Sequence, residues 1–281
     1  MEILRARDIG FCFGVRRAVE MAEKATAELG ELSSLGSIVH NRQVVERLAA
    51  MGLKVVASPA EAGSGALIIP SHGVAPDVIA EAKRLGLRVI DATCPMVTRS
   101  QLWAKRLSHD GFTIVIFGNP DHPEVRGVLG WAQGKGIAFP DGEALQSILL
   151  PSRIAVLSQT TQTEARFASF VGRLLDLHLK GLREMRVINT LCNATTSKQA
   201  ATQELAAEVD LMIVVGGRES ANTRHLANVA EAEGVETHQV EEASQVDAAW
   251  LQGHQRIGIT AGASTPNEAI DAVAARIEEL A

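Results

Sequence analysis

The sequence predicts an α/β protein built from three pseudo-symmetric units, each with a small parallel sheet, packed around a common centre. Two observations lead to this fold class. Apolar runs of strand length alternate with segments of helical periodicity along the 281 residues. The chain also contains three cysteines, and their surroundings read as three copies of one pattern. The copies recur every 80–100 residues or so, which is longer than a solenoid repeat and about the size of a small domain.

The first element of each copy is a short apolar strand, followed by the cysteine and then by an amphipathic helix. A cysteine at such a junction can be a small buried hydrophobe, a nucleophile or a metal ligand, and one copy does not distinguish among these. The three stretches are ILRARDIGFCFGVRRAVEMAEKA (3–25), LRVIDATCPMVTRSQLWAKRL (87–107) and MRVINTLCNATTSKQAATQEL (185–205).

Two more strand-and-helix elements follow in every copy. The next element is a strand, a glycine, a short polar loop and a helix, and the one after it is a strand, a turn rich in Ser, Thr or Gly, and a helix. The former element spans 31–52, 112–134 and 210–234, and the latter spans 65–86, 152–174 and 255–277.

The repeat is circularly closed. The third copy reaches Ala281 without a closing strand, and the stretch EILRARDI near the N-terminus supplies one. We therefore expect one unit at 13–93, a second at 94–191, and a third at 192–281 plus 1–12. No linker rich in Pro, Gly or Ser separates them, so tight packing of the three units is expected.

Composition and charge narrow the classes of partner. A net charge of −6 gives no general attraction to nucleic acid or to an anionic membrane, and the longest apolar runs have only strand length. No basic segment followed by an apolar stretch stands at Met1, so we expect no secretory signal. Three widely separated cysteines do not predict a disulfide framework. These features predict a cytoplasmic protein that binds neither nucleic acid nor membrane.

The three cysteines point to a metal or an iron–sulfur cluster. Loops at the carboxyl ends of parallel strands converge on the functional crevice of an α/β protein, so Cys12, Cys94 and Cys192 are expected to meet at the centre. The alternative is that all three are small buried hydrophobes. Their spacing matches neither a close-paired zinc site nor a ferredoxin. Three thiolates on a 4Fe–4S cluster leave one iron open, and that iron can bind a substrate oxygen.

Polar side chains stand at the other strand ends, each just before a helix. Helix N-termini with exposed amides form anion sites, and imidazole, hydroxyl and amide groups can donate to phosphate oxygens. The alternative for Ser and Asn is helix capping, whereas histidine is not a favoured cap. A partly desolvated glutamate there could deliver protons, or could be a first-turn residue favoured by the helix dipole. The candidates are His40, His72, His122, Glu124, Thr160, Ser220, Asn222 and Ser264.

The motifs that carry these residues resemble those of the 4-hydroxy-3-methylbut-2-enyl diphosphate reductases, the LytB/IspH family. The resemblance runs from Gly10 to about Pro266. It implies a trefoil of three α/β domains around a 4Fe–4S cluster, held here by Cys12, Cys94 and Cys192. It also implies removal of the allylic hydroxyl of the substrate, giving isopentenyl and dimethylallyl diphosphate, the last step of the methylerythritol phosphate route to isoprenoids. The matching motifs are GFCFGVRRAVEMA, IVHNRQVVERL, PSHGV, DATCPMV, DHPEVRG, SQTT, LCNATTSKQ and TAGASTP.

The resemblance also implies individual roles. Glu124 would be the proton donor, and Thr160 would belong to the hydrogen-bond relay around the hydroxyl. Electrons would come from ferredoxin or flavodoxin. One departure is Ala221, which stands where the family usually has a second serine, so weaker or rearranged phosphate contacts are expected. The residues implied to hold the diphosphate are His40, His72, His122, Ser220, Asn222 and Ser264.

Two other functions are compatible with three cysteines around a cluster. One is an enzyme like quinolinate synthase, whose substrates carry carboxylates instead of a diphosphate; the DHPEV and TAGAST stretches favour the reductase. The other is a non-enzymatic iron–sulfur sensor. A sensor that binds nucleic acid is disfavoured by the acidic charge and by the lack of an evident basic recognition helix. A sensor would also have little use for three histidines and a glutamate beside the cluster.

Overall fold

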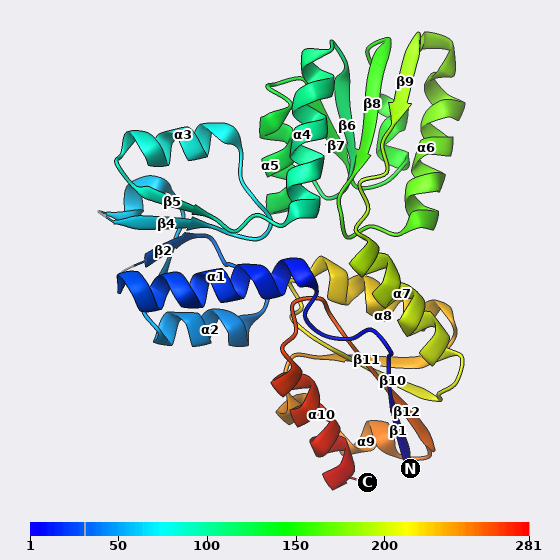
Figure 1. Cartoon of the computed structure of the whole chain (residues 1–281). Coiled ribbons are helices and arrows are strands. Elements are labelled where there is room, and N and C mark those ends of the chain that lie inside the picture. Colours follow the sequence, from blue (N-terminus) through cyan, green and yellow to red (C-terminus); the bar gives the residue numbers. More distant parts are fainter. Residues whose placement is uncertain (31, 64, 281) are drawn as a thin grey trace. The chain divides into compact units, whose positions relative to one another are not determined.

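The structure, a computed structural model, describes residues 1–30, 32–63 and 65–280. Within these residues, twelve strands form three sheets of four strands, and every pair of neighbouring strands is parallel. Helices cover the sheets (Figure 1). The predicted α/β class with three small parallel sheets is therefore confirmed.

The first sheet in chain order is flanked by three helices. Its strand order is β3-β2-β4-β5. One of its two central strands, β4, has four apolar side chains and is fully buried, as is typical of a parallel sheet. The elements are α1 (Phe13–Leu29), β2 (Leu32–Leu35), α2 (Arg42–Ala50), β3 (Leu53–Val56), η1 (Pro59–Ala62), β4 (Ala66–Ile69), α3 (Pro76–Arg84) and β5 (Arg88–Asp91).

The second sheet has the strand order β7-β6-β8-β9. Helices α4 and α5 lie on one face of it and α6 on the other (Figure 1). The elements are α4 (Pro95–His109), β6 (Thr113–Phe117), α5 (Pro123–Trp131), β7 (Gly136–Phe139), η2 (Glu143–Ser147), β8 (Arg153–Ser158), α6 (Glu164–His178), η3 (Leu179–Gly181) and β9 (Glu184–Val187).

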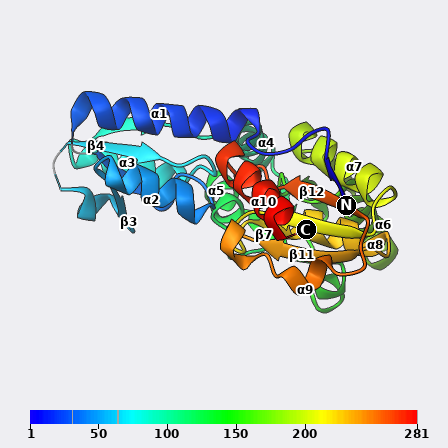
Figure 2. The same ribbon diagram turned by 90° about the horizontal axis from the view of Figure 1, so that it is seen from below.

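The third sheet joins the two ends of the chain. Its strand order is β1-β12-β10-β11, with Glu2 of β1 in register with Arg256 of β12. Figure 2 shows α10 along one face of this sheet, where it contacts β10 and β12. The elements are β1 (Glu2–Arg5), α7 (Asn193–Ala206), β10 (Leu211–Val215), α8 (Ala221–Ala232), β11 (Glu236–Val240), η4 (Ala243–Gln245), α9 (Ala248–Leu251), β12 (Arg256–Ala261) and α10 (Asn267–Leu280).

The three sheets repeat one topology. In each sheet the strand nearest the following cysteine is an edge strand: β5 before Cys94, β9 before Cys192 and β1 before Cys12. The N-terminal strand thus takes the place that β5 and β9 hold in the other two sheets. All strands of a sheet run parallel, so the loops that leave their carboxyl ends gather at one edge of that sheet.

The described chain divides into two compact units. One unit consists of Met1–Arg16, Val39–Glu46 and Asn193–Ala281, and the other of Arg17–Ile38 and Arg47–Cys192. The second unit holds two of the sheets, which meet where α5 packs against the segment before α3. There the indole N–H of Trp131 donates to the carbonyl of Val74 at 3.0 Å. Gly130 lies so close to Ala75 that a Cβ at this position would overlap the alanine side chain.

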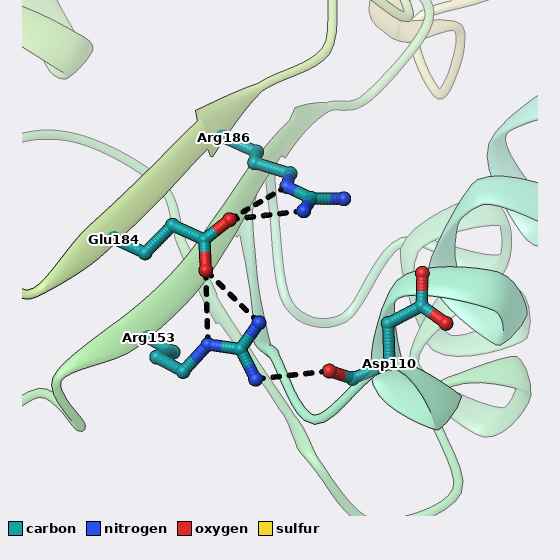
Figure 3. A network of polar contacts seen from close by, with 4 residues as sticks. All are labelled: Asp110, Arg153, Glu184 and Arg186. Carbon is teal, nitrogen blue, oxygen red and sulfur yellow. Dashed lines mark hydrogen bonds and ion pairs between the residues drawn. The ribbon is translucent and has the colours of Figure 1, made fainter.

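The amino ends of β8 and β9 are joined by a charged network (Figure 3). Arg153 donates to one carboxylate oxygen of Glu184 at 2.9 and 3.0 Å, and Arg186 donates to the other oxygen. Both guanidinium groups lie over the ring of Phe112, at 4.3 and 4.4 Å from its centroid. Arg153 also donates to the carbonyl of Asp110. The network is at the opposite end of these strands from Cys192, so it holds strands together and leaves the carboxyl ends open.

Candidate functional site

The three cysteines share one backbone environment. The N–H of Cys12 donates to the carbonyl of Ala263 at 3.1 Å. The N–H of Cys94 donates to the carbonyl of Ser71, and that of Cys192 to the carbonyl of Thr160, both at 2.9 Å. Each acceptor lies in the loop after the strand that neighbours the cysteine's own strand, namely β12, β4 and β8. The threefold pattern read in the sequence is therefore repeated in the hydrogen bonds.

Each cysteine also stands at the start of a helix. Helices α1, α4 and α7 begin at the residue after Cys12, Cys94 and Cys192, and Cys94 is the N-cap residue of α4. The N–H of Val15 points at the sulfur of Cys12, at 3.5 Å. Iron–sulfur clusters are held by cysteine side chains. All three cysteines are half-buried. The chemistry of this donor set fits an iron–sulfur cluster.

The three cysteines are divided between the two compact units. Cys12 belongs to the first compact unit, and Cys94 and Cys192 belong to the second. Within the described residues, no set of three or more His, Cys, Asp or Glu side chains is placed to hold a metal ion. The polar candidates are likewise divided between the two units.

The clearest contact in the second unit joins Glu124 to Thr160. The backbone N–H of Thr160 donates to Glu124 Oε1, and its hydroxyl donates to Oε2, both at 2.7 Å. Glu124 is only 4% exposed. Burial raises the pKa of the Glu124 carboxyl above its ordinary value, and the two hydrogen bonds from Thr160 oppose that rise. Thr160 also accepts the N–H of Cys192, so it connects the carboxyl group to a cysteine.

His122 begins α5 as its N-cap, a role that the sequence analysis did not expect of a histidine. Its Nδ1 accepts the backbone N–H of Glu124 at 3.2 Å. This contact requires an unprotonated Nδ1, so the proton of a neutral ring stands on Nε2. Proline at the first helical position then fixes the start of α5. The same turn thus positions the imidazole and the buried carboxyl group.

His72 lies in the turn that accepts the N–H of Cys94. The hydroxyl and the backbone N–H of the preceding residue, Ser71, both donate to the carbonyl of Ile38. The following residue, Gly73, has a φ of +69°, and a Cβ there would collide with Gln101. Only glycine suits this turn, which places His72 next to the cysteine's backbone partner.

In the first unit, His40 and Ser264 meet. The Ser264 hydroxyl donates to the carbonyl of His40 at 3.2 Å, and both residues follow strands of parallel sheets. Gly217 approaches the same carbonyl so closely that a Cβ would stand 2.9 Å from it. Burial lowers the pKa of the His40 imidazole; the charge of Glu219 opposes this and that of Arg224 adds to it. His40 is thus biased toward the neutral ring.

Ser220 and Asn222 lie at the start of α8. Ser220 is its N-cap, and its hydroxyl accepts the N–H of Thr223 at 3.3 Å. Asn222 is only 4% exposed, and within the described part of the chain neither its amide nitrogen nor its amide oxygen has a hydrogen-bond partner. An unsatisfied buried amide is costly and calls for a ligand or another polar partner. Ala221, between them, is buried and offers no hydroxyl.

Lys198 and Asp8 form an ion pair that was not predicted from the sequence. Lys198 Nζ donates to Asp8 Oδ1 at 2.6 Å, and the lysine side chain is 1% exposed. The pair joins α7, which starts after Cys192, to the loop that carries Cys12. Burial raises the pKa of Asp8, but hydrogen bonds from Lys198 and Ser197 and nearby positive charges outweigh it, so the net direction is downward. The local sequence hints at a buried lysine only through the position of Lys198 among small residues in α7.

Comparison with known proteins gives one family. A model described as LytB protein matches residues 3–278. A protein of Dehalococcoides mccartyi (strain CBDB1) is 47% identical over 281 residues, which is 100% of this chain and 99% of the relative. One from Geobacter sulfurreducens is 46% identical over 280 residues, covering 100% and 98%. Both relatives are named 4-hydroxy-3-methylbut-2-enyl diphosphate reductase.

Two solved structures that are similar to this chain are also reductases of this kind. The (E)-1-hydroxy-2-methyl-but-2-enyl-4-diphosphate reductase of Plasmodium falciparum has a TM-score of 0.88 and 26% identity, covering 96% of this chain and 86% of that one. A second, described as (E)-4-hydroxy-3-methyl-but-2-enyl diphosphate reductase, the terminal enzyme of the non-mevalonate pathway, has a TM-score of 0.69 and 38% identity, covering 99% and 100%. None of the described helices combines the length and hydropathy that a bilayer crossing requires.

Proposed function

Because the chain belongs to the LytB protein family, we propose that it reductively removes the allylic hydroxyl group of (E)-4-hydroxy-3-methylbut-2-enyl diphosphate. The products are isopentenyl and dimethylallyl diphosphate, and the step is the last one of the methylerythritol phosphate route. The relatives' names and their full-length coverage support this function. In this chain the proposed function rests on the hydrogen bonds of Thr160. This residue donates to the carboxyl group of Glu124 and accepts the N–H of Cys192.

We propose that Cys12, Cys94 and Cys192 together hold one 4Fe–4S cluster at the centre of a trefoil of three units, bounded at 13–93, 94–191, and 192–281 plus 1–12. The shared backbone environment of the cysteines and their places at helix N-termini support this assignment. When bound, such a cluster would supply single electrons and an iron without a protein ligand for the substrate's oxygen.

Glu124 is the proposed proton donor. Burial favours its protonated form before the reaction, so a proton is held at the carboxyl group. After the proton leaves for the hydroxyl group, which departs as water, the two donors of Thr160 stabilise the carboxylate. Thr160 therefore belongs to the catalytic relay. A second proton and two electrons complete the balance of the reaction.

The proposed diphosphate ligands are His40, His72, His122, Ser220, Asn222 and Ser264. Nε2 of neutral His122 is a donor because Nδ1 is occupied by Glu124 N–H. Asn222 supplies an amide that the described protein leaves without a partner. The N-termini of α5 and α8 add backbone donors and positive dipole ends. Ala221 removes one hydroxyl contact, and its backbone N–H remains as a donor.

The reaction needs an external reductant, and we propose a ferredoxin or a flavodoxin for this role. The proposal is tested first by single-turnover assays of anaerobically purified, cluster-loaded protein reduced with dithionite. Wild type should form both C5 diphosphates. Glu124→Gln, which keeps the side chain's shape, should react about 10²–10⁴-fold more slowly.

A matched control separates this role from folding. Glu143→Gln changes an exposed first-turn glutamate of η2 in the same compact unit and should leave turnover unchanged. Equal turnover by wild type and Glu124→Gln would remove Glu124 from the mechanism and keep the reductase. Absence of product from a wild-type protein with an intact cluster would overturn the proposed function.

A further inference from the structure

Helix α4 carries an exposed basic surface that none of the roles above uses. The helix contains Arg99, Lys105 and Arg106 and no acidic residue, although the chain has a net charge of −6. All three cations are exposed. Within the described chain, none of them forms an ion pair with a carboxylate. The surface therefore presents to the solvent three cations that form no ion pair among the described residues.

Two hollows lie along this surface and share Leu102 and Arg106. One has a volume of about 490 Å³ and is also lined by Arg17 and Trp103, with Asp91 as its one acidic residue. The other has a volume of about 400 Å³ and is also lined by Lys105 and His109, with Asp110 as its one acidic residue. Leu102 is 56% exposed. Arginine and tryptophan around an apolar side chain are the residue types that protein interfaces favour.

Aromatic rings hold two of the cations in place. The guanidinium of Arg106 lies 5.6 Å from the ring centroid of Trp103. The ammonium of Lys105 lies 5.6 Å from the ring centroid of Trp131. Such contacts limit the freedom of long side chains, so less entropy is lost when a partner binds.

The basic surface starts at a proposed cluster ligand. Cys94 is the N-cap of α4, and its neighbours Thr93 and Pro95 line the larger hollow. Arg17, from α1, donates to the carbonyl of Thr93 at 3.1 Å. A helix of this length spans about 22 Å. A partner bound along α4 therefore lies on one continuous surface, and one end of that surface is at Cys94.

We propose that the α4 face, defined as Arg99, Leu102, Trp103, Lys105 and Arg106, docks an acidic one-electron carrier protein. This inference rests on the proposed reductase function, which requires two electrons from outside. In each transfer the carrier's reduced cofactor loses one electron and the group held at Cys94 gains it, with no bond made or broken. The α4 face is thus the entry point of the electrons.

The extent and chemistry of the α4 face favour a protein over a small anion. A phosphate-sized ligand needs one compact cradle, whereas here the cations are spread over two hollows around an exposed leucine. Electron-transfer complexes bury little surface and are steered by opposite charges. An acidic carrier protein fits both properties, because its negative charge would be attracted to the α4 face even though the chain as a whole is acidic.

The test compares two charge-reversal variants. Lys105→Glu/Arg106→Glu alters the α4 face at two cationic groups that, among the described residues, contact only the rings of Trp131 and Trp103. Lys180→Glu/Arg183→Glu makes the same change in net charge at two exposed cations near the end of α6. Arg99 is left intact because it donates to the carbonyl of Asn189, in the loop before Cys192.

The first readout is binding, which needs no turnover. Oxidised, strongly acidic flavodoxin is titrated calorimetrically into holoprotein at low and at high ionic strength. Wild type should bind more weakly in high salt, and the α4 variant should bind about tenfold more weakly than wild type in low salt. The control variant should stay within about twofold of wild type. Equal binding by the α4 variant and wild type, or wild-type binding that salt does not change, would overturn the α4 proposal.

The second readout separates docking from chemistry. All three proteins should turn over equally with dithionite, and only the α4 variant should be slowed when reduced flavodoxin is the donor. Equal flavodoxin-driven rates in all three would overturn the docking surface and leave the reductase intact. A wild type that forms no product with dithionite would overturn the reductase, while the binding comparison would still decide whether the α4 face docks the carrier.

Discussion

Thr160 donates both its backbone N–H and its hydroxyl to the carboxyl group of Glu124, each at 2.7 Å. The same residue accepts the N–H of Cys192 at 2.9 Å. A buried acid and a candidate metal ligand are therefore positioned by one threonine. Its carbonyl fixes the cysteine's backbone, and its two donors become more favourable once the carboxyl group has lost its proton.

Replacing Thr160 with valine should slow turnover about tenfold. The variant keeps the backbone N–H and the shape of the side chain but loses the hydroxyl donor to Oε2. A hydrogen bond to a charged group contributes about 1.5–3 kcal/mol, and here it is strongest after proton transfer. Single-turnover rates with dithionite measure the effect. Thr160→Ser, which retains the hydroxyl, should recover most of the rate, and failure to do so would point to packing by the methyl group instead.

The stability of the protein should depend on pH through Glu124. Its carboxyl pKa is raised by burial, so its stabilising contribution is complete below the ordinary value of 4.5 and is lost as the pH rises through the folded-state pKa. Relative to Glu124→Gln, wild type should therefore lose stability as the pH increases above 4.5. Urea unfolding of both proteins at a series of pH values gives this difference. Difference infrared spectra should show a protonated-carboxyl band that is missing in the variant. Parallel stability curves without that band would contradict the raised pKa.

Asn222→Ala should weaken substrate binding without weakening the fold. Neither polar atom of this amide has a partner among the described residues, so its removal breaks no protein hydrogen bond. We expect KM to rise about tenfold and the unfolding free energy to fall by less than about 1 kcal/mol. Ser220→Ala is the contrasting variant, since it removes the cap of α8 and should cost about 1 kcal/mol of stability. A large loss of stability in Asn222→Ala would show that the amide is structural.

The Asp8–Lys198 pair should respond asymmetrically to substitution. Asp8→Asn leaves a buried ammonium without its charged partner and should cost about 3 kcal/mol. Lys198→Met replaces the lysine with an apolar chain of similar length and leaves a partly exposed carboxylate, so the cost should stay below about 1.5 kcal/mol. Urea unfolding of both variants tests the order, and the reverse order would contradict the assignment of Lys198 as the group that depends on the pair.

Substitution of a proposed cluster ligand should remove iron and preserve the fold. Serine caps helices well, so Cys94→Ser keeps the start of α4. We expect the iron content and the visible absorbance to fall severalfold, with unchanged far-ultraviolet circular dichroism. Thr98→Ser, one turn further along α4, serves as the matched control and should keep its iron. Full iron content in all three single Cys→Ser variants would contradict a three-cysteine cluster.

The sequence by itself determined the type and order of three strands and three helices in each copy, but it did not predict the fourth strand of each sheet, which is β3, β7 or β11. Apolar periodicity and turn residues act over a few neighbours, and the three copies of strand, cysteine and helix reinforced one another. The same local pattern placed every candidate at a strand end and predicted the N-terminal strand as the partner of the last copy, which the pairing of β1 with β12 confirms. The unit boundaries and the convergence of the cysteines stay predictions.

Only the tertiary structure decided which of those groups interact and how they titrate. Glu124 and Thr160 lie 36 residues apart, and Asp8 and Lys198 are separated by 190. From the sequence, Glu124 is compatible with two roles, a proton donor and a first-turn residue of a helix, and nothing there predicts that His122 caps α5. Desolvation and hydrogen-bond partners depend on what long-range packing brings against a side chain, and no local pattern records that. The pKa of a buried carboxyl group and the unpartnered amide of Asn222 are therefore properties of the folded chain.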